Sequence, residues 1–417
     1  MSQILMLLVL AGWVVLRLVH LSRSKADPVL GFILVGAAIS RAGIGLVNYY
    51  LGPLPGARID AIWFDETART LALVPSGPSS FVIELGRAGY SSILAVFYMI
   101  GGYHFFLPTM INLIFTIEFL ILVYRIGLNL GGYPVARITA LCAALYPTSM
   151  VYTSVPLREA PLLWGLALYV HTLLQYYDGQ RRLLSARLLF SLAFLVWLHD
   201  GFALAIFLIP IALWFKNSHL SVGRRALFLG AGAAVILAAF AGALTFFEFR
   251  KMPADPAMLL DPEWLARMRE VKSAYGVGYG AFEPTWRGIL TSAPLLLFAF
   301  VASPFPIWWE SMSELPKLFE GLLSLFLTLT ACVTVYYASG DVTYGKRKFL
   351  LSMFLFLVFV FAMGTGNTGI AARHRAKFIW MPILLTAAAY CGRTAPEHGP
   401  PVGVPLGGRP PSLRPGH

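Results

Sequence analysis

Apolar runs separated by short polar stretches follow one another along the whole chain. Several runs contain about 18 to 22 residues, the length that an α-helix needs to cross the hydrocarbon core of a bilayer. They lie at residues 4–20, 28–49, 107–124, 136–153, 160–177, 187–198, 202–215, 226–246, 316–337, 348–365 and 378–391. This pattern predicts an all-α protein, a polytopic transmembrane helical bundle with about 11 to 13 spans.

The composition favours the same class and argues against others. Hydrophobic residues make up 58% of the chain and charged residues only 12%, which is more apolar surface than a soluble core can absorb. Cys142, Cys332 and Cys391 have no paired spacing, so the sequence indicates neither a disulfide framework nor a zinc site. The net charge of +12 would suggest nucleic acid in a soluble protein, but here the excess lies in short loops between spans. We therefore expect membrane lipid, and no nucleic acid, among the partners.

The clusters of Lys and Arg predict which helix ends face the cytoplasm, because short loops rich in these residues are retained there. The clusters are Arg23/Lys25, Arg125/Arg137, Arg181/Arg182/Arg187, Lys216/Arg224/Arg225 and Lys346/Arg347/Lys348. All of them fall on one side if residues 90–104 do not cross the membrane. We interpret this aromatic, glycine-containing segment as a helix in the outer interface, and residues 288–306 have the same ambiguity.

This topology divides the chain into two parts. Residues 1–391 form a transmembrane domain with outer loops at 51–106 and 247–315, and the Pro/Gly-rich residues 392–417 are predicted to be a disordered cytoplasmic tail. Most of the unusual polar segments then face outward together, at residues 60–87, 153–159, 199–201, 247–287 and 367–377.

Three carboxylates follow the second apolar run. Asp60, Asp65 and Glu66 lie in a segment where Asp60, Phe64 and Ala68 share one face of a helix. Acids placed there serve chemistry or stand outside the hydrocarbon. Asp60 is the candidate general base, and Asp65 and Glu66 are candidates for substrate binding. The alternative for Asp60 is to cap a helix that begins at residue 61, and the alternative for Asp65 and Glu66 is solvation.

Two further pairs lie in the outward segments. Arg158-Glu159 forms part of a substrate-binding site or, alternatively, a local ion pair at a helix start. His199-Asp200, at the break between two short spans, resembles an acid/base or metal site, but a simple turn explains it equally well.

Basic residues supply the remaining candidates for substrate binding. Arg373, His374 and Arg375 place positive charge on the outer side, against the orienting pattern, which favours a function beyond anchoring lipid head groups. Arg41 lies inside the second apolar run, where it should face the bundle and pair with an acid or a phosphate; the alternative is that its side chain extends to the membrane interface. Glu118, in the middle of another run, is the candidate structural partner of Arg41.

The long outer loop at 247–287 contains carboxylates, arginines and tryptophans. Its run from Asp261 to Lys272 predicts an amphipathic surface helix. Aromatic residues beside carboxylates suit sugars, but a lid or interfacial helix with solvated charges is the simpler interpretation.

Several of these segments together resemble the GT-C glycosyltransferases, integral membrane enzymes that use polyprenyl-phosphate-linked sugars. Asp60, Phe64 and Ala68 match an early outer-loop acid followed by an aromatic residue and an alanine. Residues 143–160 look like the family's helix, outer loop, acidic residue and next helix, and residues 366–375 look like the late basic loop of polysaccharide polymerase-like members. The chain departs from the family in an additional span before the acidic loop and in having no large C-terminal outer domain, which argues against an oligosaccharyltransferase-like role.

The resemblance implies a chemistry as well as a GT-C-like fold. The partners would be a polyprenyl-phosphate-linked sugar donor and a glycan or lipid-linked acceptor, and a single displacement would invert the anomeric centre. Asp60 would take the acceptor's proton, while Arg158, Arg373 and Arg375 would stabilise the leaving phosphate. No cofactor is indicated by the residues; a divalent cation, Mg²⁺ or Mn²⁺, that bridges the phosphate is compatible with this chemistry.

The implied setting is cell-surface polysaccharide biosynthesis in a bacterial inner membrane, with the active site facing outward. Two alternatives stay open. One is a flippase or transporter of lipid-linked glycans, although the internal pseudo-symmetry common in transporters is not clear in this chain. The other is an O-antigen ligase or polymerase of a different fold, in which Asp60 would be dispensable and Arg373 essential.

Overall fold

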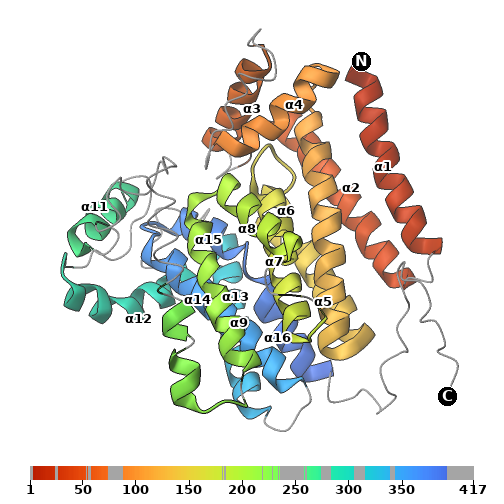
Figure 1. Cartoon of the computed structure of the whole chain (residues 1–417). Helices are drawn as coiled ribbons and strands as arrows, with labels where there is room; N and C mark the ends of the chain where they lie inside the picture. Colours follow the sequence, from red (N-terminus) through yellow and green to blue (C-terminus); the bar gives the residue numbers. More distant parts are fainter. Residues whose placement is uncertain are drawn as a thin grey trace, which may run out of the picture.

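The computed structural model is all-helical over the residues that it describes (Figure 1), which confirms the predicted all-α class. These residues are 3–23, 27–52, 54, 58–73, 88–180, 182, 185–217, 219–227, 229–232, 234, 258, 261–273, 283–304, 315–338 and 343–391. The predicted span at 226–246 lies largely outside the described residues, the loop at 247–287 lies partly outside them, and the predicted tail at 392–417 lies wholly outside them.

Within the described residues, sixteen elements follow one another in chain order. They are α1 (Gln3–Arg23), α2 (Pro28–Tyr50), α3 (Arg58–Leu73), α4 (Gly89–Gly101), α5 (Leu107–Leu145), α6 (Pro147–Tyr152), α7 (Glu159–Tyr177), α8 (Ala186–Leu198), the 3₁₀-helix η3 (Asp200–Phe207), α9 (Leu208–Lys216), α11 (Pro262–Ser273), α12 (Trp286–Ala302), α13 (Leu315–Tyr337), α14 (Tyr344–Met363), α15 (Thr368–Arg375) and α16 (Trp380–Cys391).

Several helices have the length and apolar character of membrane spans. Within the described residues four are long and apolar enough to cross a bilayer: α1, α2, α5 and α13. Their outer faces expose large apolar side chains, such as Phe32 at 79% and Phe326 at 59% exposure. Soluble monomers rarely expose apolar surface on this scale, so the fold is compatible with a membrane protein.

Helix α5 contains two predicted spans in one element. The backbone leaves helical geometry at Gly131 and Gly132, and the positive φ of 76° at Gly132 is one that glycine adopts without strain. A Cβ on Gly127 would lie 2.6 Å from the Cα of Ala136, so the two arms pack closely beyond this bend. The second arm ends at Leu145 rather than at the predicted residue 153, and α6 begins separately at Pro147.

One end of the bundle gathers the loops predicted to be cytoplasmic. Asp27, which caps α2, accepts hydrogen bonds from Arg137 at 2.5 and 2.8 Å. Lys346, at the start of α14, lies 2.9 Å from Asp178 after α7 and 2.8 Å from Asn129 in α5. We call this the basic end, and it contains Arg137 and Lys346, which belong to two of the clusters that the charge pattern placed on one side of the membrane.

The opposite end, where α1 begins, is crossed by α4 (Figure 1). A Cβ on Gly89, the first residue of α4, would lie 2.6 Å from the carbonyl oxygen of Trp197 at the end of α8. A Cβ on Gly101, the last residue of α4, would lie 2.8 Å from Met6 near the start of α1. Both ends of α4 therefore lie at the same end of the bundle, which is the geometry expected of an interfacial helix. We call this the site end.

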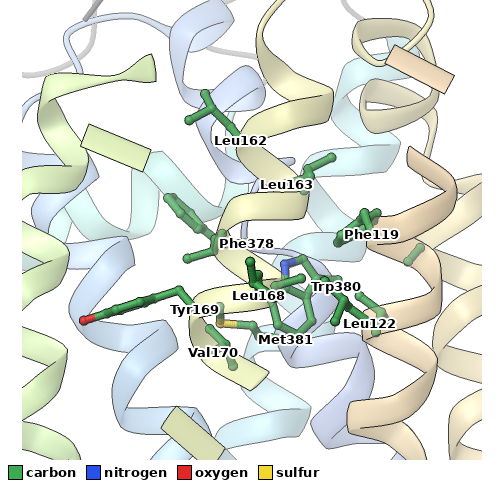
Figure 2. Packing of buried hydrophobic residues seen from close by; sticks show 14 of the residues in the cluster. Phe119, Leu122, Leu162, Leu163, Leu168, Tyr169, Val170, Phe378, Trp380 and Met381 are labelled. Atoms are coloured by element: carbon green, nitrogen blue, oxygen red, sulfur yellow. The ribbon is translucent and has the colours of Figure 1, made fainter. Parts of the chain in front are cut away.

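The core between the two ends is built by α5, α7 and α16 (Figure 2). The rings of Phe119 in α5 and Trp380 in α16 meet edge to face at 6.3 Å, a favoured aromatic geometry. Leu163 and Tyr169 of α7 are almost fully buried, and the Tyr169 hydroxyl donates to the carbonyl of Ala205 at 3.0 Å. This apolar core holds the first residues of α7 and the residues before α16 in fixed positions.

The predicted span at 202–215 is two elements rather than one helix. His199 has extended backbone, and its ring nitrogen accepts a hydrogen bond from the N–H of Gly201 at 3.1 Å, so the chain restarts as η3 before α9. The predicted surface helix at 261–272 is present as α11, and it docks on the site end. Arg269 of α11 donates to the carbonyls of Ala362 and Met363 at the end of α14 at 3.1 and 3.3 Å, where helix carbonyls lack partners of their own.

Candidate functional site

Charged side chains from three distant segments meet at the site end. Asp60 lies in the first turn of α3, Glu159 is the first residue of α7, and Arg373 lies in α15. Arg373 is 313 residues from Asp60 and 214 from Glu159 in sequence, yet its guanidinium contacts both carboxylates. The fold therefore joins three of the predicted site residues.

Arg373 forms a fork between the two acids. Its Nε donates to Oε1 of Glu159 at 2.5 Å, and its Nη1 donates to Oδ2 of Asp60. The guanidinium lies 5.9 Å from the ring of Tyr152, within range of a cation–π contact. Its Nη2 is buried and has no hydrogen-bond partner among the described residues. Arg373 is thus held firmly but keeps one donor available.

The two carboxylates differ in burial. The side chain of Glu159 is 3% exposed, whereas that of Asp60 is 32% exposed. Glu159 also faces Lys377, with Nζ 3.7 Å from Oε1, and its Oε2 has no hydrogen-bond partner in the described part of the chain. Glu159 is therefore the inner partner of Arg373, and Asp60 is the outer one.

The electrostatics keep this group ionised. Burial acts to raise the pKa of Glu159, but the positive charges of Arg373 and Lys377 outweigh it and hold that pKa below its usual value. Burial acts to lower the pKa of Arg373, but Glu159 and Asp60 outweigh it and raise that pKa. The ion pairs are consequently charged at neutral pH.

Arg158 precedes Glu159 and is buried with it. Its Nη1 donates to the carbonyl of Leu198 at 2.6 Å, at the C-terminal end of α8, and its guanidinium lies 5.9 Å from the ring of Phe64 in α3. Burial, helped by the charge of Arg373, lowers the pKa of Arg158 to about 10, so the side chain still carries its charge at neutral pH. The prediction of a simple Arg158–Glu159 ion pair is wrong, because the acid binds Arg373 instead.

The remaining predicted outer residues complete this group. The rings of His199 and His374 are 5.5 Å apart, and Nζ of Lys377 lies 2.9 Å from Nδ1 of His374. Asp200 is 3% exposed and acts electrostatically on Arg158. We call the whole set the charged cluster: Asp60, Arg158, Glu159, His199, Asp200, Arg373, His374 and Lys377.

Asp65 and Glu66 lie outside the charged cluster. Asp65 accepts hydrogen bonds from Tyr98 and Arg69, and the guanidinium of Arg69 stacks 3.7 Å over the ring of Tyr103, so this set fastens α3 to α4. Glu66 is exposed. The capping alternative for Asp60 is also wrong, because α3 begins at Arg58 and places Asp60 inside its first turn.

Arg375 points away from the charged cluster, although it belongs to the same basic motif as Arg373. Its Nη1 donates to the carbonyls of Phe300, Val301 and Ser303 at 3.3, 3.0 and 2.8 Å. These contacts hold the end of α12 against α15. The predicted binding of phosphate by Arg375 has no support in this geometry.

Arg41 is buried, as predicted, but it pairs with no acid among the described residues. It donates to the hydroxyl of Thr153 at 2.9 Å and to the carbonyl of Ala144 at 3.0 Å. Glu118 pairs with Arg17 of α1 at 2.6 Å, so the expected Arg41–Glu118 pair is wrong. Arg41 fixes the segment that leads from α5 to Glu159 instead of joining the charged cluster.

Sequence reasoning missed two polar residues at this end. Lys377 lies two residues beyond the predicted basic motif, at the end of the outward segment 367–377, but it was not among the candidate site residues. Glu320 is 7% exposed in α13 and accepts a hydrogen bond from the hydroxyl of Thr148 in α6 at 2.6 Å. A carboxylate inside an apolar run is costly, and this signal would have found it.

A metal site is not evident in this arrangement. Within the described ranges, no three His, Cys, Asp or Glu side chains group closely enough to hold a metal ion. The carboxylates of Asp60 and Glu159 instead bind one guanidinium. The donor set of the described residues therefore gives no support to a bound Mg²⁺ or Mn²⁺.

Comparisons with known proteins assign the chain to no family. No protein-family model matches the chain, and no curated protein matches it. The resemblance to GT-C enzymes stays a prediction from short motifs, and a functional assignment depends on the chemistry of the charged cluster.

Proposed function

We propose that this chain is a membrane glycosyltransferase of GT-C type. It transfers or polymerises sugar from a polyprenyl-(pyro)phosphate-linked donor on the extracytoplasmic face of a bacterial inner membrane, during cell-surface polysaccharide biosynthesis. The observation that carries the proposal is the meeting of Asp60, Glu159 and Arg373 at one end of an apolar bundle. An acid and a guanidinium in contact there provide a base and an anion-binding group at the place where a lipid-borne phosphate emerges from a bilayer.

Asp60 is the general base in this proposal. A sugar hydroxyl is a weak nucleophile near neutral pH, and a carboxylate within hydrogen-bond reach removes its proton as attack proceeds. Asp60 is 32% exposed and open to an acceptor, whereas Glu159 is 3% exposed and engaged by two cations. This difference in exposure favours Asp60 as the general base. It favours Glu159 as the residue that anchors Arg373.

The transfer balances without a further reactant. The acceptor oxygen forms a bond to the anomeric carbon, and the bond from that carbon to the phosphate oxygen breaks with its electron pair left on the phosphate. The proton of the acceptor hydroxyl passes to Asp60. Arg373 stabilises the charge that develops on the phosphate, since guanidinium groups bind such oxygens in pairs, and Arg158 and Lys377 add positive charge beside it.

The apolar exterior supports a lipid-linked donor over a soluble one. The exposed faces of α1, α2 and α13 carry large apolar side chains up to the site end, including Ile4 at 68% and Phe319 at 66% exposure. A polyprenyl chain can lie along such a surface while its phosphate reaches the charged cluster. A nucleotide-linked donor would need no contact with this surface.

The direct test is sugar transfer by the purified chain in proteoliposomes that contain polyprenyl-phosphate-linked sugars. Asp60→Asn should lower kcat by about 10²- to 10⁴-fold through loss of the base. Arg373→Ala should lower it by about 10²- to 10³-fold through loss of charge stabilisation. Glu66→Gln is the matched control, because it removes an exposed carboxylate from the same helix, and it should leave the rate unchanged within about twofold.

Other results would point to the alternatives. Full activity of Asp60→Asn together with inactive Arg373→Ala would favour a ligase or polymerase of another fold. Movement of the lipid-linked sugar between leaflets, with no new glycosidic bond, would favour a transporter. Either result would reject the proposed enzyme.

A further inference from the structure

Arg373 binds two acids that are not equivalent. Glu159 is buried and also faces Lys377. Breaking its contact with Arg373 would therefore leave buried charges without an ion-pair partner. Asp60 stands at the edge of the charged cluster and is about one-third exposed, so water can solvate it if it leaves. The guanidinium therefore has one fixed partner and one exchangeable partner.

The contact with Arg373 conflicts with the role of Asp60 as a base. A carboxylate that holds a guanidinium has a reduced affinity for protons, because protonation would sacrifice the ion pair. Asp60 in this arrangement is therefore a poor acceptor for the proton of a sugar hydroxyl. Something must separate it from Arg373 before transfer begins.

We propose that Asp60 occupies the position on Arg373 that the donor's phosphate takes, so that phosphate binding displaces the carboxylate and activates it as a base. This inference rests on the proposed function, since it names the step that starts the reaction in the same site. The phosphate and the carboxylate are both anions whose oxygens accept hydrogen bonds from a guanidinium. One can therefore replace the other while Arg373 keeps a negatively charged partner.

The charge balance favours this exchange. Arg158, Arg373 and Lys377 carry three positive charges. The carboxylates of Asp60, Glu159 and Asp200 lie opposite them, the cluster also contains His199 and His374, and the ring of Tyr152 lies beside Arg373. A bound phosphate adds negative charge to this balanced set. The excess is relieved when Asp60 takes up a proton, which is the event that the transfer reaction supplies.

The exchange couples base activation to donor binding. While the site holds no donor, the carboxylate lies on Arg373 and cannot activate water or an acceptor. Once the phosphate is bound, Asp60 is released next to the leaving group, where the acceptor must attack. The ion pair between Asp60 and Arg373 thus disfavours deprotonation of water or of the acceptor before the donor is bound.

The test measures phosphate binding without sugar or acceptor. Wild-type protein and its variants in nanodiscs are titrated with polyprenyl phosphate in one arm and inorganic phosphate in the other. If the carboxylate holds Arg373 in about 90% of unliganded molecules, Asp60→Asn should bind polyprenyl phosphate about tenfold more tightly, because the competent fraction rises to unity. Arg373→Ala should bind it weakly, and adding Asp60→Asn to Arg373→Ala should give no gain. Glu66→Gln should bind like the wild type.

Each outcome bears on the proposal. If Asp60→Asn binds only polyprenyl phosphate more tightly, the proposal is supported and the ligand is the lipid-linked phosphate. If it binds inorganic phosphate more tightly by the same factor, the proposal is supported and the phosphate group alone is the ligand. Unchanged or weaker binding by Asp60→Asn overturns it, as does the same gain in the absence of Arg373.

A second measurement avoids substitutions that alter folding. Carbodiimide labelling of the wild-type carboxyl groups, followed by mass spectrometry, should show greater labelling of Asp60 when polyprenyl phosphate is added, and unchanged labelling would contradict the exchange. These readouts are independent of sugar transfer. Tighter phosphate binding by Asp60→Asn without any sugar transfer by the wild type would support the exchange and reject the proposed glycosyltransferase activity. Sugar transfer by the wild type with no gain in phosphate binding by Asp60→Asn would support the activity and reject the exchange.

Discussion

Replacing Glu159 with glutamine should destabilise the protein more than any other conservative change of a single carboxylate in the charged cluster. Glutamine keeps the shape of the side chain but removes its charge. Arg373 and Lys377 would then keep their positions, 14% and 2% exposed, without the acid that they share. Removing one partner of a buried ion pair leaves an uncompensated charge, which is the costly way to break it.

The expected loss follows from this geometry. Breaking a buried pair costs about 3–5 kcal/mol. Asp60 still contacts Arg373 and the new amide can accept a hydrogen bond, so the lower end of about 3 kcal/mol applies. At about 2 °C per kcal/mol the melting temperature should fall by about 6 °C.

The assay is thermal unfolding of purified protein in detergent, followed by intrinsic fluorescence. Glu66→Gln is the control, and its exposed carboxylate should change Tm by no more than about 1 °C, as most surface substitutions do. A Glu159→Gln variant as stable as this control would refute the reasoning, since it would mean that Arg373 and Lys377 do not depend on Glu159.

The pH dependence gives an independent check. The pKa of Glu159 is lower in the folded protein than its ordinary value of 4.5. Its contribution to stability is therefore complete above pH 4.5 and is lost as the pH falls through the lower, folded pKa. The difference in Tm between wild type and Glu159→Gln should be constant from neutral pH to about pH 5 and should shrink below it. A difference that grows on acidification would contradict this assignment.

Three further predictions concern the frame around the charged cluster, each measured as a change in Tm. Gly127→Ala should lower the stability by about 1–3 kcal/mol, because the new Cβ would meet the backbone of Ala136. Gly43→Ala is the control, and it should be neutral or stabilising because the space around Gly43 is open. Equal effects of the two substitutions would show that the arms of α5 separate easily. Asp27→Asn should cost about 1–3 kcal/mol near neutral pH and less at acid pH, since hydrogen bonding from an arginine holds the pKa of Asp27 low; a loss that is the same at pH 3 would contradict this. Arg69→Ala should cost about 1 kcal/mol, because its side chain is 42% exposed, and a loss above about 3 kcal/mol would show that α3 depends on it far more than its exposure implies.

The helical class and the presence of several apolar helices long enough to cross a membrane could be predicted from the sequence, because apolar runs of bilayer length have few other solutions. Local backbone chemistry decided where the elements break. The predicted run at 136–153 is divided, because α5 ends at Leu145 and α6 begins at Pro147, and the predicted run at 202–215 is divided into η3 and α9. Such interruptions depend on single residues and do not alter the average hydrophobicity of a run.

The members of the charged cluster were also largely predictable, since charge is rare in this chain. Their pairing was not. Arg158 and Glu159 are neighbours in sequence, yet the acid faces α15 and the arginine faces α8, because adjacent positions at a helix start point in different directions. Arg373 and Arg375 likewise diverge from one short helix, so one reaches the acids and the other reaches backbone carbonyls.

Two acids on one guanidinium separate stability from activity. Glu159 is buried, so its removal should lower Tm, and any effect on transfer should follow from a misplaced Arg373. Asp60 is about one-third exposed, and after solvent screening its ion pair should contribute no more than about 1 kcal/mol. Asp60→Asn should therefore nearly abolish transfer while Tm stays within about 2 °C of the wild type. If both substitutions instead lowered Tm equally, Asp60 would be a structural partner of Arg373 and its assignment as the base would lose its physical ground.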